Sequence, residues 1–145
     1  MELVQNKRGK YDYHIVETFE AGLVLVGTEV KSLRNHGGSL QEAYIKVIGG
    51  EIWLIGAHIA PYSHGNIHNH EERRDLKLLL HKKEIAKLEV LAHQKGMALV
   101  PLALYLKGGR VKLKFGLGKG KKHEDKRQTI IEREKKREMD RAIKR

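Results

Sequence analysis

The hydrophobic pattern of the first part of the chain changes its period at Gly22. Residues 13–19 alternate between apolar and polar side chains, which predicts a strand with one apolar face. Residues 23–26 are continuously apolar, which is typical of a strand buried on both faces. We therefore expect one long strand that bends or bulges at Gly22.

A short helix is predicted directly after this strand. Thr28 is a candidate N-cap, Glu29 lies favourably in the first turn, and the sequence His-Gly-Gly at 36–38 ends the helix. Lys31 and Arg34 are three residues apart and share the side opposite to the apolar residues. A solvated helix face is the simplest interpretation of these charged residues.

The remainder of the body is predicted to consist of short strands joined by glycine turns. Gly49-Gly50 and Gly108-Gly109 each separate two apolar segments and suit tight turns. An apolar stripe predicts a helix over 81–96. The strands expected around these features cover 43–48, 51–55, 59–62, 97–106 and 110–117. This pattern favours a mainly β fold with flanking helices, and it leaves a small antiparallel barrel and a sandwich open.

The chain has 145 residues and a formal net charge of +11, and much of this charge lies near its C-terminal end. Residues 118–145 contain 12 Lys or Arg and 6 Asp or Glu, a net charge of +6, whereas the other residues contain 17 and 12, a net charge of +5. This composition predicts a polyanionic partner, most simply a nucleic acid. We expect a body over 1–117 and a basic tail over 118–145.

The two ends of the chain differ in their predicted order. Residues 1–11 are polar and basic, so we expect a loosely held arm. The tail has too few apolar residues to build a core, but its helix propensity is good, and Asp125 followed by Gln128 resembles a capping box. Isolated helices of this length are marginal in water. We therefore expect the tail to be disordered alone and helical on a polyanionic surface.

Several protein classes are disfavoured by what the sequence lacks. There are no cysteines, hence no disulfides, no thiolate metal ligands and no cysteine nucleophile, which fits a reducing cytosol. No apolar run approaches the roughly 20 residues of a membrane helix, and the first residues contain no apolar signal-peptide segment. We expect a cytoplasmic protein without a membrane partner.

Two segments resemble sites of known chemistry without completing them. Residues 116–122 resemble a phosphate-binding loop but lack its four-residue spacer and its Ser or Thr, so we interpret them as a flexible basic hinge. His64, His68 and His70 could reach one metal ion, although a solvated loop is the simpler interpretation. Trp53 is expected to pack within a strand rather than stack on a ligand. We expect no catalytic residue, no metal site and no cofactor.

Three functions are compatible with these observations. An RNA-binding adaptor without catalysis accounts for the basic body and the basic, foldable tail. A generic ribosome-associated or DNA-binding protein accounts for the positive charge equally well. An enzyme or nuclease-like module would use the histidine loop. The charge does not separate the first two functions.

Four segments resemble, in the same order, the motifs of one known family. They are FEAGLVLVGTEVKSLR, LLLHKKEI, LVPLALY and GKGKKHEDKR. The resemblance covers nearly the whole chain and is to the SsrA-binding protein (small protein B) family, the protein partners of transfer-messenger RNA in bacteria. It implies an oligonucleotide-binding-like β-barrel whose body binds the tRNA-like part of that RNA. It also implies that the tail enters the empty messenger channel and decoding centre of a stalled ribosome, with elongation factor Tu in the delivery complex.

The resemblance also implies roles for individual residues. The residues expected to bind RNA are Asn6, Lys7, Arg8, Glu29, Lys31, Arg34, Arg74 and Lys77. The residues expected to face the ribosome are Gly120, Lys121, Lys122, His123, Asp125, Lys126 and Arg127. Two positions depart from the family's motifs. Leu76 replaces an expected cation, for which Arg73 could substitute, and Glu124 replaces the aromatic or histidine residue that usually precedes Asp-Lys-Arg.

Overall fold

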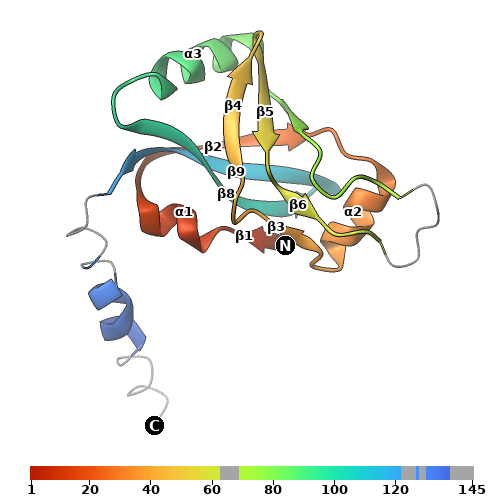
Figure 1. The fold of residues 1–145 in the computed structure, drawn as a ribbon, viewed down its shortest axis with the longest axis horizontal. Coiled ribbons are helices and arrows are strands. Elements are labelled where there is room, and N and C mark those ends of the chain that lie inside the picture. Colours follow the sequence, from red (N-terminus) through yellow and green to blue (C-terminus); the bar gives the residue numbers. More distant parts are fainter. Residues whose placement is uncertain (63–68, 122–126, 128–129, 138–145) are drawn as a thin grey trace.

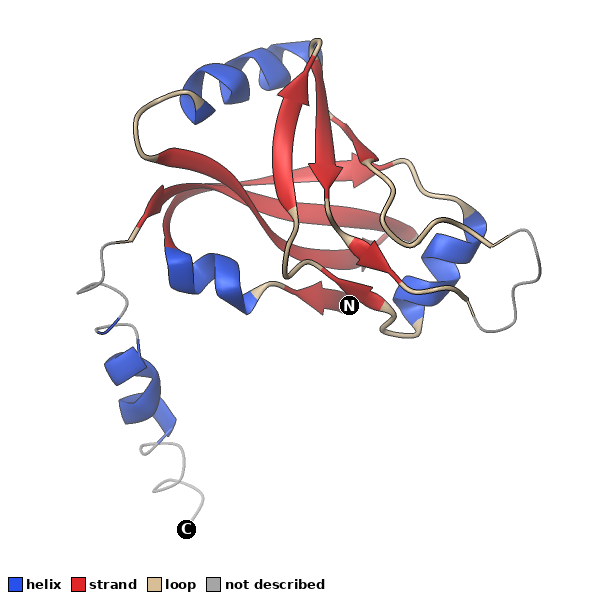
Figure 2. Ribbon diagram, viewed as in Figure 1, coloured by secondary structure: helices blue, strands red, loops and turns tan. Residues whose placement is uncertain are grey.

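The structure is a computed structural model that describes residues 1–62, 69–121, 127 and 130–137. The elements are shown in Figure 1 and Figure 2 and have these bounds, in chain order: β1 (Glu2–Gln5), α1 (Lys7–Asp12), β2 (Tyr13–Leu23), α2 (Gly27–Arg34), β3 (Gly38–Ser39), β4 (Tyr44–Ile48), β5 (Glu51–Ile55), β6 (His58–Ile59), β7 (Leu76–Leu79), α3 (Lys82–Ala92), β8 (Met97–Lys107) and β9 (Arg110–Gly120).

The strands form a curled antiparallel sheet. Seven strands are hydrogen-bonded in the order β1-β8-β9-β2-β7-β5-β4, and β3 pairs separately with β6. The β4–β5 hairpin crosses the long strands, and β4 packs close to β8 (Figure 1). The predicted antiparallel, mainly β architecture with flanking helices is therefore confirmed. Within the described residues no ladder joins β1 to β4, so hydrogen bonds do not close the sheet into a barrel.

The core lies between the long strands, the hairpin and the helices. Every second residue along β9 is apolar and buried, namely Val111, Leu113, Phe115 and Leu117. The Phe115 ring stacks on Phe19 of β2 with a centroid distance of 5.5 Å. Leu33 of α2 and Leu88 of α3 are at most 1% exposed. Each of these two helices therefore contributes its apolar side to one common core.

Both predicted glycine turns are present. Gly49-Gly50 joins β4 to β5 and Gly108-Gly109 joins β8 to β9, with φ values between 58° and 77°. Glycine adopts such positive φ values without steric cost, which suits two-residue turns between twisted strands. The pairs that flank the turns, Ile48 with Glu51 and Lys107 with Arg110, set the register of each hairpin.

The N-terminal residues belong to the fold, so the prediction of a loosely held arm over 1–11 is wrong. β1 pairs with β8, and its two central residues are buried. Asn6 then caps α1, because its side-chain oxygen accepts a hydrogen bond from the Gly9 N–H at 3.3 Å. The Asn6 amide also donates to the Pro101 carbonyl at 2.7 Å. Two buried apolar residues and one cap thus anchor a segment whose composition is mostly polar.

The strand β2 ends at Leu23, the first residue of the apolar run that was predicted to continue it. Val24 and Val26 are 47% and 49% exposed and lie in the connection to α2, so the prediction of a strand buried on both faces over 23–26 is wrong. The Val24 N–H still donates to the Lys77 carbonyl at 3.1 Å, which ties the connection to β7. The chain leaves the sheet here because the next residues begin a helix.

The strand β9 continues to Gly120 and crosses the predicted boundary between 117 and 118. A Cβ on Gly116 would lie 2.7 Å from Ile15 Cγ2, and one on Gly118 would lie 2.9 Å from the Tyr13 Cβ. These glycines therefore allow β2 to pack closely on β9, and the prediction of a flexible hinge beginning at Gly116 is wrong. The register irregularity in this ladder lies just after Ile15, and not at Gly22 as predicted.

The described part of the tail is helical. Residues 127 and 130–137 are in helical conformation, which fits the good helix propensity of the tail. Disorder of the tail in the absence of a polyanionic surface stays a prediction. The residues predicted to cap this helix, Asp125 and Gln128, lie outside the described residues. No helix within the described ranges has the length and apolar composition of a membrane span.

Candidate nucleic-acid interface

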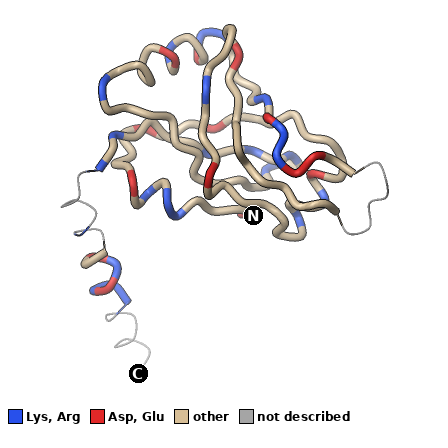
Figure 3. Tube along the Cα trace, viewed as in Figure 1, with Lys and Arg blue, Asp and Glu red and all other residues tan. Residues whose placement is uncertain are grey.

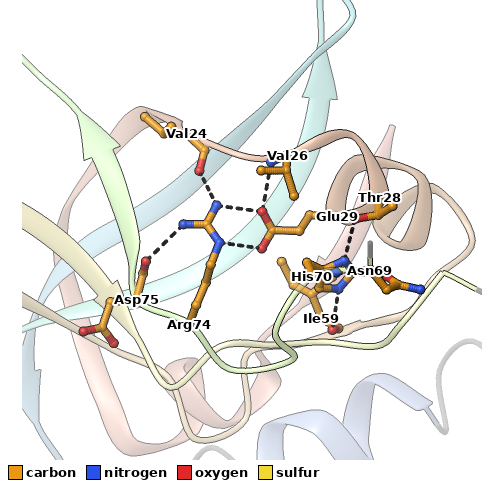
Figure 4. A network of polar contacts seen from close by, with 9 residues as sticks. All are labelled: Val24, Val26, Thr28, Glu29, Ile59, Asn69, His70, Arg74 and Asp75. Atoms are coloured by element: carbon orange, nitrogen blue, oxygen red, sulfur yellow. Dashed lines mark hydrogen bonds and ion pairs between the residues drawn. The ribbon is translucent and has the colours of Figure 1, made fainter. Parts of the chain in front are cut away.

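A buried ion pair joins the start of α2 to the segment before β7 (Figure 4). Glu29 is 0% exposed, and its carboxylate accepts hydrogen bonds from Arg74 Nε at 3.1 Å and Arg74 Nη2 at 2.7 Å. The same carboxylate accepts from the Val26 N–H at 2.9 Å. Arg74 also donates to the carbonyls of Val24 at 3.0 Å and Asp75 at 3.4 Å. These bonds fix the entry to α2 against the segment that leads into β7.

Helix capping explains why Glu29 turns inward. A glutamate at the third helical position can reach back to the N-cap N–H, which here belongs to Val26 and not to the predicted cap Thr28. A buried carboxylate needs a paired cation, and the planar guanidinium of Arg74 supplies a two-bond match. The expectation that Glu29 lies exposed on α2 is therefore wrong. The geometry gives Glu29 and Arg74 a structural role.

His70 provides a second link at the same end of α2 (Figure 4). Its Nδ1 lies 2.9 Å from the Thr28 hydroxyl, and its Nε2 lies 2.9 Å from the Ile59 carbonyl. Because a carbonyl only accepts hydrogen bonds, the proton is assigned to Nε2, and Nδ1 accepts from Thr28. His64 and His68 lie outside the described residues. Within the described ranges no group of three potential metal ligands occurs.

The outward side of α2 is basic, as predicted. Lys31 and Arg34 are exposed, whereas Ser32 and Leu33 are buried. The Lys31 ammonium lies 5.6 Å from the centre of the Tyr62 ring, within the range of a cation–π contact. These two cations face solvent and are available to phosphate groups.

The helix α1 and its N-cap contain three further residues that the resemblance assigns to RNA, Asn6, Lys7 and Arg8. Lys7 and Arg8 are exposed. Arg8 forms an ion pair with Asp12 at 3.1 Å and lies 5.4 Å from the centre of the Tyr11 ring. Asn6 differs from both, because it is 8% exposed and its side chain is used as the cap of α1. Figure 3 shows that Lys and Arg are distributed over several elements of the body.

A groove lies on the outer side of β2 and β7, beside the turn between β8 and β9. It consists of two adjoining hollows of about 410 and about 310 Å³ that share Gly22, Leu79 and Lys112, and we call it the Leu79 groove. His81 lines one hollow and Arg110 the other. Leu79 is 53% exposed, so the floor of the groove offers an apolar side chain to solvent. The groove thus combines an apolar floor with a rim of mixed charge, on which Lys112 and Arg110 lie beside the acidic residues Glu20 and Glu84.

Glu20 is an acidic residue at the edge of this groove. The Tyr105 hydroxyl donates to its carboxylate, and the Lys107 ammonium lies 3.4 Å away. The hydrogen bond from Tyr105, followed by the charge of Lys107, holds the pKa of Glu20 below its ordinary value. Partial burial, and then the Glu20 carboxylate, raise the pKa of Tyr105 to about 12. The groove therefore presents an ionised carboxylate that can accept hydrogen bonds.

Leu79 and the groove around it were not predicted from the sequence. One signal was available, since Leu76 and Leu78 alternate with Lys77 and Leu79 along β7. Leu76 and Leu78 are each 1% exposed, so this alternation directs Leu79 outward. The neighbouring run of three leucines, 78–80, hides this alternation because it is uniformly apolar. Residues from β2 and β9 complete the groove, and no local pattern indicates their proximity.

The resemblance assigns two more basic positions near β7, and one departs from the family. The Lys77 side chain is 42% exposed, and its ammonium lies 3.2 Å from the Glu51 carboxylate. Leu76, which replaces an expected cation, points into the core. Arg73 is 54% exposed and donates to the Gly56 carbonyl at 3.1 Å. Lys77 and Arg73 thus place exposed basic side chains on β7 and just before it, each beside a carboxylate, Glu51 and Glu42 respectively.

The structure describes only part of the expected ribosome-facing segment. Gly120 ends β9, and the Lys121 N–H donates to the Asp12 carbonyl at 2.9 Å, so both residues are attached to the body. Arg127 is helical. Lys122, His123, Asp125 and Lys126 lie outside the described residues, as does Glu124.

The comparison with known sequences shows one family. The family model described as SmpB protein matches residues 3–145. The SsrA-binding protein of Protochlamydia amoebophila is 58% identical over 143 residues, which cover 99% of this chain and 94% of that protein. The SsrA-binding protein of Chlamydia caviae is 55% identical over 144 residues, covering 99% and 96%, and that of Thermobifida fusca is 51% identical over 143 residues, covering 99% and 89%.

A solved structure is similar as well. It is described as "tmRNA-SmpB: a journey to the center of the bacterial ribosome", and one of its chains aligns with a TM-score of 0.70 and 42% sequence identity. The alignment covers 87% of this chain and 92% of that chain. The sequence match spans nearly the whole chain and the structural match includes most of the fold. The chain belongs to the SmpB protein family.

Proposed function

We propose that this protein is an RNA-binding adaptor of trans-translation. It binds the tRNA-like part of transfer-messenger RNA and brings that RNA to stalled ribosomes, where the incomplete proteins are tagged. The observation that carries the proposal is the family match over residues 3–145, together with relatives named SsrA-binding proteins. The similar chain in a structure named for tmRNA, SmpB and the bacterial ribosome supports the same function.

We assign the Leu79 groove to the RNA. Lys112 and Arg110 can neutralise phosphates, and the exposed Leu79 can pack against the apolar face of a ribose or a base. Glu20 repels phosphate, but its carboxylate can accept hydrogen bonds from base amino or imino groups. Lys112 and Arg110 therefore contribute affinity, and the Glu20 carboxylate contributes selectivity.

Exposed cations outside the groove extend the positive surface. On α1 and α2 they are Lys7, Arg8, Lys31 and Arg34. Each can contact a phosphate but reads no base, so these residues increase affinity for any RNA and position the correct one. Glu29 and Arg74 support this surface indirectly, because their ion pair holds α2 in place.

The tail is assigned to the ribosome. It carries a net charge of +6, and residues 130–137 are helical. A basic helix can follow a channel lined by RNA phosphates, so we propose that the tail enters the empty messenger channel and reaches the decoding centre of the small subunit. Elongation factor Tu is proposed as a further component of the delivery complex. This role places the protein in the cytoplasm and assigns no reaction to it.

The proposal is tested by comparing the binding of the full chain to transfer-messenger RNA and to an unrelated RNA of equal length. We expect transfer-messenger RNA to bind at least about tenfold more tightly, a difference of about 1.4 kcal/mol. Both affinities should fall with increasing salt, because both RNAs share the phosphate contacts.

Equal affinities for the two RNAs would contradict the proposal and favour a generic basic protein. A second measurement uses the RNA that copurifies with the protein from a native lysate. One dominant structured RNA supports the adaptor, whereas a diffuse mixture of RNAs supports the generic binder.

A further inference from the structure

A row of three side chains crosses the outer surface of the sheet at β4, β5 and β7. In the antiparallel register Lys46 of β4 lies opposite Trp53 of β5, and Trp53 lies opposite Lys77 of β7. Directly opposed residues of an antiparallel pair project from the same face, with strands about 4.8 Å apart. The indole of Trp53 therefore lies between two lysines whose backbones are about 10 Å apart.

This row lies on the side of the sheet that faces away from the core. Ile52 and Leu54, the sequence neighbours of Trp53, are 0% exposed and point inward. Trp53 itself is half-buried, whereas Lys46 is exposed and the Lys77 side chain is 42% exposed. In Figure 1 the β4–β5 hairpin lies in front of the long strands, and none of the labelled helices crosses its near side.

Apolar and acidic side chains surround the row. Tyr44 and Ile48, on the same face of β4 as Lys46, are 52% and 49% exposed. The acidic residues are Asp75, which is exposed just before β7, and Glu51, whose carboxylate lies 3.2 Å from the Lys77 ammonium. This carboxylate occupies one of the three donors of that ammonium, so Lys77 retains donors for a second anion.

The row adjoins the Leu79 groove. Lys77 and Leu79 are two residues apart on β7, so they project from the same face of the strand. Leu79 forms the floor of the groove, and Lys77 is the first member of the row beyond it. A strand of RNA that leaves the groove along this face therefore meets Lys77, Trp53 and Lys46 in that order.

An aromatic face between two cations is suited to nucleic acid. Proteins bind unpaired nucleotides by stacking bases on aromatic rings while basic side chains follow the phosphates. We propose that the Lys46–Trp53–Lys77 row is a second RNA contact, in which one unpaired base stacks on Trp53 and adjacent phosphates lie against the two lysines. This inference rests on the proposed function, because it extends the RNA surface of the Leu79 groove across β5 and β4.

Fluorescence gives a direct test, because Trp53 is the only tryptophan in the chain. The wild-type protein is titrated with transfer-messenger RNA while its tryptophan emission and the anisotropy of labelled RNA are recorded. We expect the emission to be quenched with the same midpoint as the anisotropy, since a base stacked on the indole quenches it. Unchanged emission at saturating RNA overturns the inference.

Variants test the same contact through affinity. We expect Trp53→Leu to weaken binding about tenfold, because stacking of a single base accounts for an effect of this size, and Trp53→Phe to retain most of the affinity. Lys46→Ala should lower the salt dependence by roughly one phosphate contact, whereas the matched variant Lys95→Ala, on an exposed loop, should leave it unchanged. Melting temperatures confirm that each variant is folded.

The outcomes separate the inference from the proposed function. If transfer-messenger RNA binds tightly but Trp53 emission, Trp53→Leu and Lys46→Ala show no effect, the row is not an RNA contact and the proposed function stands. If transfer-messenger RNA binds no more tightly than unrelated RNA, the proposed function fails. A change of Trp53 emission on addition of a protein partner, but not on addition of RNA, would also overturn the inference.

Discussion

Two neighbouring parts of the molecule depart from the usual distribution of charged and apolar side chains. At the start of α2 the carboxylate of Glu29 is fully buried, whereas at the end of β7 the side chain of Leu79 is 53% exposed. Burial of a carboxylate is costly unless it is paired, and exposure of a leucine gives up hydrophobic stabilisation. The first arrangement holds two elements together, and the second leaves an apolar surface for a partner.

This difference shows that a charged residue within a family motif does not by itself indicate RNA contact. Glu29 and Arg74 neutralise each other and use their polar atoms within the fold. The groove differs, because its apolar floor and the cations Arg110 and Lys112 at its rim are open to a partner. We therefore expect substitutions at the buried pair to affect stability and substitutions at the groove to affect binding.

The largest effect is expected for Glu29→Ala. This change leaves Arg74 without its partner and the Val26 N–H without its acceptor, so we expect a loss of about 3 kcal/mol in the free energy of unfolding. The value is at the lower end for a broken buried pair, because the Arg74 side chain is 31% exposed. Urea denaturation measures the loss, and Glu89→Ala on the exposed side of α3 serves as control.

A loss below about 0.5 kcal/mol for Glu29→Ala, the usual range for surface sites, would contradict the structural role. The double variant Glu29→Ala/Arg74→Ala sharpens the test. The second change removes the unpaired cation. The double variant should therefore lose clearly less free energy of unfolding than the two single variants lose in sum.

A similar loss of about 3 kcal/mol is expected in the tail, where helix geometry can be separated from charge. Proline in a helix interior costs about 3 kcal/mol, so Glu134→Pro should weaken docking on the ribosome about a hundredfold if the tail docks as a helix. Glu134→Ala makes the same charge change and should be tolerated. Single-turnover peptidyl transfer on stalled ribosomes compares the two variants, and equal activity would mean that the tail acts as a flexible polycation.

A smaller effect is expected at the edge of the groove at high pH. The pKa of Tyr105 is raised to about 12 in the folded protein, above its ordinary value of 10.0. The folded state therefore holds this proton more tightly, and its contribution to stability is lost as the pH rises from about 10 to about 12. Tyr105→Phe should remove this part of the alkaline decrease in stability. Urea midpoints at pH 9 and 11 test the expectation. An equal decrease of the midpoint between these pH values in the wild type and in Tyr105→Phe would contradict it.

Features with a local signal could be predicted from the sequence. The glycine turns, the alternation in β9 and the outward position of Lys31 and Arg34 follow from neighbouring residues alone. The helix after β2 was also expected, although its cap is Val26 and not Thr28. Here the local pattern and the tertiary structure agree.

Features that depend on distant residues could not be predicted. The burial of Glu29 requires Arg74, which lies 45 residues later. The order of the N-terminal segment requires β8, and Asn6 contacts Pro101 across 95 residues. The Leu79 groove forms where β2, β7 and the turn after β8 meet, so none of these segments indicates it alone. The exposed connection at Val24 could not be predicted for the same reason, because the local apolar run does not show where the chain leaves the sheet.

The most direct measurement of the central claim is the pair of variants Leu79→Ala and Val90→Ala. Both remove an exposed apolar side chain, 53% exposed in the groove and 67% exposed on α3, respectively. We expect each variant to lose less than about 1 kcal/mol of stability, because much of each side chain already contacts water. Leu79→Ala should weaken binding of transfer-messenger RNA about tenfold, whereas Val90→Ala should leave it unchanged. Wild-type affinity in a folded Leu79→Ala protein would contradict the account.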